Sequence, residues 1–338
     1  MKKIFILLLV IFLLSSCASE KPKNEYKGEL IDGAKRTVKI PLNNSETTIA
    51  SVYAVSVPFI VALKLTDRVV AINVKSSFWY KANDDLNKVG TVGRGTVDLE
   101  KLATYNPDVF IHRSNDLKTI EAVEKLNIDT ICITVENIED VKNTLTMMGD
   151  YFGKEQRAEE VNDWINKKIE YIDEIVSIIP NDIKKTAMVM GGELGRVAGN
   201  DMLQTWMIEK AGGIPIIKEK ENHNWINIGI EKIFTYNPEV IFCTSSTSRN
   251  YKIEELLKDS TWGSIEAVKN NDVFVIPCGN DSWDMPGISC LLGIMYMIYK
   301  MYPDYFSIED LKKEVNEYYN FMFGRTFDKE LNIVWEDL

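Results

Sequence analysis

Histidine is almost absent from this chain of 338 residues, which contains only His112 and His223. Sites for bare metal ions are usually built from several histidine, cysteine and carboxylate side chains. This scarcity therefore argues against a protein dedicated to a bare metal ion. A lone histidine at a strand end or in a polar loop more often hydrogen-bonds to its neighbours. We treat His112 and His223 as weak candidates for metal ligands and expect no resident metal or cofactor.

Cysteine is also scarce, and no two cysteines form a Cys-x-x-Cys pair. One lies near the N-terminus, at position 17, and four follow: Cys132, Cys243, Cys278 and Cys290. Three of these four lie in apolar runs, where a cysteine usually acts as a small buried hydrophobic residue. We therefore expect neither a disulfide framework nor a metal site built from cysteines.

The common catalytic motifs are missing as well. The chain has no Gly-x-Ser-x-Gly elbow, no His-Glu-x-x-His and no phosphate-binding Gly-x-x-x-x-Gly-Lys-Ser/Thr loop. Gly93-Arg94-Gly95 lacks the third glycine of a dinucleotide site. We predict that the protein is not an enzyme. A surface hydrolase and a purely adhesive protein remain as alternatives of other classes.

The N-terminus has the pattern of a secretory signal. Lys2 and Lys3 precede an apolar run at 4–14, and Leu-Ser-Ser-Cys ends at Cys17. This tetrad resembles the bacterial lipobox, which predicts a signal peptide over 1–16 and acylation of Cys17. An ordinary cleaved signal with a chance cysteine is the alternative. The polar residues that follow predict a flexible tether over 17–35.

The chain is acidic, with 39 basic and 50 acidic residues. Cleavage before Cys17 removes two lysines, so the formal net charge moves from −11 to −13. Phosphate backbones and anionic lipids repel such a protein, which argues against nucleic-acid partners and polybasic membrane binding. We expect attachment to the extracytoplasmic face of the cell membrane through the lipid alone.

An internal repeat indicates how the chain is organised. Residues 97–111 (VDLEKLATYNPDVFI) and 228–242 (IGIEKIFTYNPEVIF) align without a gap. Each copy predicts a short helix that stops before proline and a buried strand that follows. Two copies this far apart predict two related Rossmann-like α/β lobes with parallel sheets. The chain is also long enough to bury two cores.

One long helix is predicted between the lobes. Apolar residues recur at helical spacing from Lys154 to Ile179, and Pro180 supplies a stop. We therefore assign an N-terminal lobe to 36–150, a connecting helix to 151–180 and a C-terminal lobe to 181–338. Further strands are predicted at 68–74, 129–134, 186–190 and 272–277.

Taken together, the lipobox, the two lobes, the long helix and the paired repeat resemble one known family. It is that of the helical-backbone substrate-binding proteins of ABC importers for iron siderophores, heme and cobalamin. The resemblance implies a monomer that delivers a small chelate to a permease dimer. It also implies that Glu100 and Glu231, one on each lobe, dock on permease arginines. Alternatively, each glutamate only complements the dipole of its helix.

Ligands of such proteins bind at loops that follow the carboxyl ends of the strands. These loops are expected to hold aromatic, arginine and carboxylate side chains: Trp79, Tyr80, Arg94, Arg113, Glu193, Arg196, Asp281, Trp283 and Asp284. Three arginines and stiff aromatic walls would suit a large, partly apolar, anionic ligand. Solvated arginines and structurally packed tryptophans are the alternatives. We rank a ferric siderophore first, with cobalamin or heme as alternatives, since heme needs only one or two axial ligands.

Overall fold

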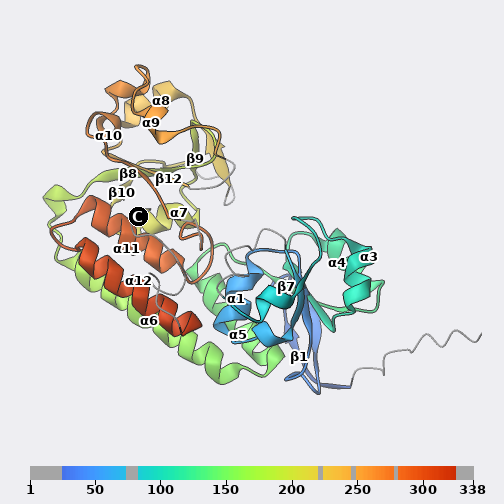
Figure 1. Cartoon of the computed structure of the whole chain (residues 1–338). Helices are drawn as coiled ribbons and strands as arrows, with labels where there is room; N and C mark the ends of the chain where they lie inside the picture. Colours follow the sequence, from blue (N-terminus) through green and yellow to red (C-terminus); the bar gives the residue numbers. More distant parts are fainter. Residues whose placement is uncertain (1–24, 74–82, 220–223, 245–248, 278–280, 325–338) are drawn as a thin grey trace, which may run out of the picture.

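The computed structural model describes residues 25–73, 83–219, 224–244, 249–277 and 281–324. Figure 1 shows two α/β lobes that diverge from a common base, along which the long helix α6 (Glu155–Ser177) runs. None of the helices within the described ranges combines the length and the apolar character that crossing a membrane requires. The predicted two-lobed α/β fold is confirmed.

The N-terminal lobe contains, within the described residues, a five-stranded parallel sheet in the order β5-β4-β3-β6-β7. Its strands are β3 (Ile49–Ser51), β4 (Val69–Ile72), β5 (Gly90–Thr91), β6 (Val109–Arg113) and β7 (Asp129–Ile133). Its helices are α1 (Ser56–Ala62), α3 (Leu99–Tyr105), α4 (Leu117–Glu124) and α5 (Ile138–Phe152). Most strand residues are buried, as expected for a sheet with helices on both faces.

The C-terminal lobe holds a sheet in the order β11-β9-β8-β12-β13, with β10 also paired to β8. Its strands are β8 (Thr186–Met190), β9 (Arg196–Ala198), β10 (Ile214–Pro215), β11 (Trp225–Asn227), β12 (Val240–Cys243) and β13 (Val273–Val275). Its helices are α7 (Leu203–Lys210), α8 (Ile230–Tyr236), α9 (Ile253–Leu256), α10 (Glu266–Lys269), α11 (Cys290–Met301) and α12 (Ile308–Phe323). The strands β10, β8, β12 and β13 pair parallel, as predicted, whereas the short strands β9 and β11 add an antiparallel edge.

The two repeats fold alike, as α3 with β6 and α8 with β12. Each helix ends at an asparagine in the left-handed conformation, Asn106 (φ 46°) and Asn237 (φ 43°), before the proline that stops it. In both repeats the residue after the proline is acidic, and its carboxylate accepts hydrogen bonds from a threonine at or beside the neighbouring strand. Asp108 Oδ2 accepts from the backbone N (2.9 Å) and hydroxyl (2.7 Å) of Thr48. Glu239 Oε2 accepts from the same two groups of Thr186, at 2.8 and 2.9 Å. The repeat therefore preserves hydrogen bonds as well as sequence.

Helix α6 lies within the stretch 154–179 that was predicted as one helix. Its 23 residues correspond to about 35 Å at the usual rise per residue. The buried side chains recur at helical spacing, from Ala158 to Ile175, and form one face. They belong to one continuous cluster of buried apolar residues that extends into the N-terminal lobe and into α11 and α12. The base of the molecule is therefore a shared core.

Helix α12, the last of the described helices, adds a second contact between the lobes. Arg157, in the first turn of α6, donates to the carbonyl oxygens of Ala62 (2.8 Å) and Phe321 (3.2 Å). Its guanidinium lies 4.4 Å from the centroid of the Phe321 ring. Ala62 is the last residue of α1, so this side chain fastens the end of α12 to the N-terminal lobe.

The predicted tether over 17–35 is wrong in its second half. Strand β1 (Tyr26–Ile31) pairs antiparallel with β2 (Thr37–Pro41) in a hairpin. Nearly all of β1 is exposed, so it carries no apolar periodicity by which the sequence would reveal it. The turn is instead fixed by Asp32, a buried carboxylate that accepts from Arg36 and from the backbone N of Cys132 in β7, the edge strand of the sheet. Cys17 lies outside the described residues.

The interpretation of cysteines in apolar runs as small buried residues agrees with the structure for the cysteines that it describes. Cys132, Cys243 and Cys290 are buried free thiols. Cys278 lies outside the described residues.

Candidate functional site

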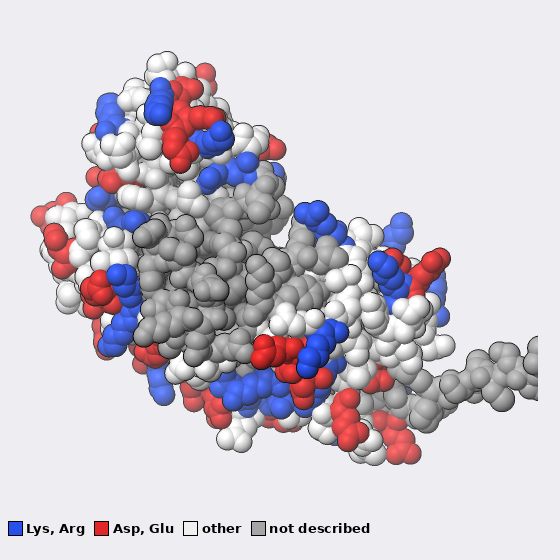
Figure 2. Space-filling view, in the orientation of Figure 1, with Lys and Arg blue, Asp and Glu red and all other residues white. Residues whose placement is uncertain are grey.

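A cavity of about 480 Å³ lies between the two lobes, at the carboxyl ends of the parallel strands. Figure 2 shows the notch between the lobes, with acidic and basic side chains interspersed on the visible face. The cavity is lined by Glu136 from the N-terminal lobe and by Gly192, Glu193, Arg196, Met202, Leu203, Gln204, Trp225, Thr244, Asp284, Met285 and Pro286 from the C-terminal lobe. Its volume is in the range that is usual for small-molecule sites.

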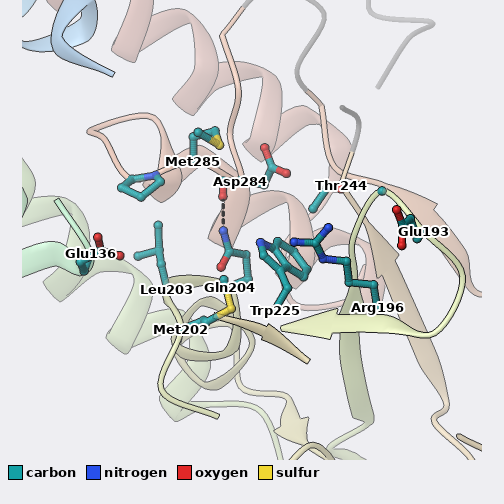
Figure 3. Close-up of a pocket in the computed structure, with 12 residues that line it drawn as sticks. Glu136, Glu193, Arg196, Met202, Leu203, Gln204, Trp225, Thr244, Asp284 and Met285 are labelled. Atoms are coloured by element: carbon teal, nitrogen blue, oxygen red, sulfur yellow. Dashed lines mark hydrogen bonds between the residues drawn. The ribbon is translucent and has the colours of Figure 1, made fainter. Parts of the chain in front are cut away.

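One wall of the cavity is the antiparallel pair β9–β11. Trp225 pairs with Ala198 and Asn227 pairs with Arg196, which makes Arg196 and Trp225 diagonal neighbours on the sheet. Figure 3 shows the guanidinium group of Arg196 beside the indole of Trp225. Gly191 allows this packing, because a Cβ atom there would lie 3.0 Å from the Trp225 ring.

The loop before β9 is fixed by hydrogen bonds on both sides. Gly191 N donates to Arg196 O (2.7 Å), and Gly191 O accepts from the Tyr251 hydroxyl (2.8 Å). Gly192 O accepts from the backbone N of Asn250 at 2.8 Å. Glu193, an exposed residue of this loop, is therefore presented to the cavity from a fixed backbone.

A further part of the lining comes from α7 and the loop before α11. Gln204 Nε2 donates to the Asp284 carbonyl at 2.7 Å, as the dashed line in Figure 3 shows. Because the nitrogen of the amide group makes this bond, the orientation of the Gln204 amide is fixed. Its oxygen, Oε1, is buried and has no hydrogen-bond partner among the described residues. The cavity lining therefore contains an acceptor that no described protein donor satisfies.

Two buried carboxyl groups lie in the loop that precedes α11. Burial raises the pKa of Asp284, which lines the cavity, to about 6. Burial likewise raises the pKa of Asp281 to about 7, although Tyr318 donates to its Oδ2 at 3.2 Å. Desolvation disfavours the charged form of a carboxyl group, so both hold a proton at higher pH than an exposed aspartate does.

On the N-terminal lobe, Tyr53, Arg113 and Glu136 lie at the carboxyl ends of the neighbouring strands β3, β6 and β7. Burial raises the pKa of Tyr53 to about 12, and the charge of Glu136 adds to this effect while that of Arg113 opposes it. The three side chains are therefore close enough to interact electrostatically. Glu136 is the member of this set that lines the cavity.

The structure does not bring the three predicted arginines together. Arg196 lines the cavity, whereas Arg94 and Arg113 are exposed and are not among its described lining residues. Arg113 instead donates to Asp116 at 3.2 Å. The expectation of three convergent arginines is corrected on this basis, because a carboxylate three residues along the chain pairs with one of them.

The placement of Trp283 is also corrected. Its side chain is 2% exposed and belongs to the apolar core, so it is not among the described residues that line the cavity. The aromatic wall is supplied instead by Trp225. Trp79 and Tyr80 lie outside the described residues.

His112 is buried at the end of β6, and its Nε2 lies 3.0 Å from Asp116 Oδ2. Burial lowers the pKa of His112 despite this contact, so the neutral ring is favoured. Among the described residues, no group of three or more histidine, cysteine or carboxylate side chains is placed to hold a metal ion. His223 lies outside the described residues.

The prediction that ligand-binding residues follow the carboxyl ends of the strands identified some of the residues that line this cavity and missed others. It identified the loops that contain Glu193, Arg196 and Asp284. It missed Glu136, although that residue follows a strand that was predicted correctly. The other missed residues are Gly192, Met202, Leu203, Gln204, Trp225, Thr244, Met285 and Pro286. Trp225 had no signal of its own, because the short strand β11 was not predicted.

Glu100 and Glu231 lie in the first turns of α3 and α8 and are both exposed. Figure 1 shows these helices near the far ends of the two lobes. The lysine after each glutamate is paired with another acid: Lys101 lies 3.9 Å from Asp98, and Lys232 contacts Glu219. Each lobe therefore presents an equivalent carboxylate at its outer end.

Comparison with known proteins places the chain among solute-binding proteins. The family model described as periplasmic binding protein matches residues 49–278. The uncharacterized ABC transporter substrate-binding lipoprotein YvrC of Bacillus subtilis is 23% identical over 319 residues, which cover 89% of this chain and 96% of YvrC. The molybdate-binding protein MolA of Haemophilus influenzae is 23% identical over 261 residues, covering 70% of this chain and 72% of MolA. The structure of Helicobacter pylori CeuE with Ni(II) bound has a TM-score of 0.73 and 19% identity, covering 91% of this chain and all of that one.

Proposed function

The chain belongs to the periplasmic binding protein family and is the substrate-binding protein of an ABC importer, and we propose that it captures an iron chelate. A ferric siderophore is the first candidate. The relatives are named for different ligands, such as molybdate and nickel, so the choice rests on the cavity of this chain.

The observation that carries the proposal is the combination of size and apolar lining. A cavity of about 480 Å³ holds far more than a small oxyanion, and Trp225, Met202 and Leu203 supply apolar surface that an oxyanion cannot use. A chelate with an organic shell would bury carbon atoms against this surface and place its polar groups near Arg196, Gln204 and the carboxylates. Cobalamin or heme would use the same features and remain the alternatives.

An absorbance titration tests this proposal. Purified protein is titrated with ferric siderophores, heme and a corrinoid, whose absorption bands differ. We expect saturable one-to-one binding of a ferric siderophore, with quenching of the Trp225 fluorescence and weaker binding by Trp225→Ala. Tight binding of heme or corrinoid, with no binding of any ferric siderophore, would overturn the choice of ligand.

We further propose that the protein is a lipoprotein on the extracytoplasmic face of the cell membrane. The lipobox at Cys17 supports this, and so does the similarity to YvrC, which is named a lipoprotein. The same proposal assigns permease docking to Glu100 and Glu231, because equivalent exposed carboxylates on the two lobes can engage one partner at two points.

A further inference from the structure

The described lining of the cavity carries more acid than base. Glu136, Glu193 and Asp284 line it, together with a single described arginine, Arg196. Three convergent arginines would have given the cavity an excess of positive charge, whereas its described lining has more acidic than basic side chains. This balance bears directly on the charge of the ligand.

Two of these carboxylates face the cavity from opposite lobes. Glu136 follows β7 in the N-terminal lobe, where its backbone N donates to Asp140 Oδ2 at 3.0 Å. Glu193 follows β8 in the C-terminal lobe, on the loop that Gly191 and Gly192 fasten. Both residues are exposed. Figure 3 shows Glu136 at one end of the cavity and Glu193 with Arg196 at the other.

Gln204 provides independent support. Its Oε1 is a buried acceptor with no described protein donor, while its Nε2 is already used by the Asp284 carbonyl. Leaving a buried acceptor unsatisfied is unfavourable, so a ligand that donates a hydrogen bond here gains more than one that only accepts. The carboxylates and the amide therefore favour the same kind of ligand surface.

We infer that the cavity selects a chelate whose exposed groups are positively charged or donate hydrogen bonds, with one acceptor group for Arg196, and that it discriminates against polyanionic chelates. This inference rests on the proposed function as a chelate-binding protein. Among ferric siderophores, it favours a trihydroxamate with a free ammonium group over a tricatecholate. Hydroxamate iron centres are neutral, whereas the tricatecholate complex is strongly anionic and would place its charge between two carboxylates.

Three ferric complexes provide the test. The first is a trihydroxamate with a pendant ammonium group, the second is its N-acetylated neutral form and the third is a tricatecholate. Affinities are measured by quenching of tryptophan fluorescence at fixed ionic strength. We expect affinity to fall in that order. Acetylation should weaken binding by about 10- to 150-fold, the usual effect of one charge-assisted hydrogen bond.

Matched variants connect this preference to the cavity. Glu136→Gln and Glu193→Gln keep the side-chain size but remove the charge, and at least one of them should abolish most of the effect of acetylation. The control is Glu139→Gln, an exposed glutamate in the first turn of α5 that pairs with Lys142 at 3.4 Å and is not among the lining residues. It should retain the parent's preference.

The outcomes separate the inference from the proposed function. Tightest binding of the tricatecholate would overturn the charge preference and leave the protein a siderophore-binding protein. A preference for the ammonium form that both glutamine variants retain would overturn the assignment to these carboxylates. Failure to bind any of the three complexes would contradict the inference and the proposed function together.

Discussion

Removal of the Glu314 carboxylate should destabilise the protein strongly, because it leaves a buried lysine without its nearest partner. Lys168 of α6 lies 2.6 Å from Glu314 of α12, and both residues are less than 10% exposed. Burial opposes the charge on Lys168, but hydrogen bonds to Glu314 and Glu317 outweigh it and raise its pKa. Loss of one partner of a buried pair usually costs about 3–5 kcal/mol. We expect Glu314→Ala to lower the free energy of unfolding by about 3 kcal/mol, at the low end of this range, because Glu317 still contacts the lysine at 2.9 Å.

Glu317→Ala is the matched control on the same helix. It removes a carboxylate from the same lysine, but this side chain is 47% exposed, so the expected loss is about 0.2–1 kcal/mol. The double variant Lys168→Met, Glu314→Leu removes both charges and should be close to the parent in stability, because apolar residues of similar size often replace buried ion pairs without loss.

Urea denaturation, followed by circular dichroism, measures these free energies of unfolding. The raised pKa of Lys168 means that the stabilisation is present below the ordinary lysine pKa of 10.5 and is lost as the pH rises through the folded value. The difference between Glu314→Ala and the parent should therefore persist throughout the neutral range. Equal losses for Glu314→Ala and Glu317→Ala would refute the reasoning that burial determines the cost.

Three further predictions concern docking, anchoring and pH. Glu100→Ala and Glu231→Ala should each slow uptake in cells while ligand affinity stays at the parent's value, since linked contacts reinforce one another; normal uptake by the double variant would contradict docking. Cys17→Ser should abolish fatty-acid labelling and release the protein or leave it unprocessed, whereas unchanged labelling would contradict the lipobox. Because Asp281 and Asp284 have folded pKa values of about 7 and 6, above the ordinary 3.8, they favour folding most at low pH. Stability should therefore fall as the pH rises from about 4 to 7, and Asp281→Asn should flatten this fall in the melting temperature; an unchanged slope would show that burial of Asp281 does not cause it.

The parts of the fold that the sequence predicted are those with a local physical signal. The repeat combined apolar strands with an asparagine-proline stop, and both copies fold as expected, with Asn106 and Asn237 in the left-handed conformation. Helix α6 could be predicted because one face is apolar over about five turns, from Ala158 to Ile175. The hairpin β1–β2 has no such signal, because β1 is exposed and is held by Asp32, which acts across about 100 residues of sequence.

The same contrast between local signals and distant contacts explains which cavity residues could be predicted. Strand ends locate loops, and this rule correctly selected the loops of Glu193 and Arg196. It does not determine where a side chain in a loop points. Trp283 turned into the core, and Arg113 paired with Asp116, while Trp225 entered the cavity from a short antiparallel strand. The charge of the cavity therefore depended on tertiary contacts that no local pattern encodes.

The way the lobes are joined determines how much the cavity can change when a ligand binds. Hinged proteins often bring new residues to a ligand when flexible segments between their lobes bend. Here the lobes share one apolar core along α6, and Arg157 fastens α12 to the end of α1, so bending would have to break buried contacts on both helices. Lys168 joins the same two helices farther along. A base of this kind resists large closure, so Glu136 and Glu193 should face a bound ligand from much the same positions that they occupy here.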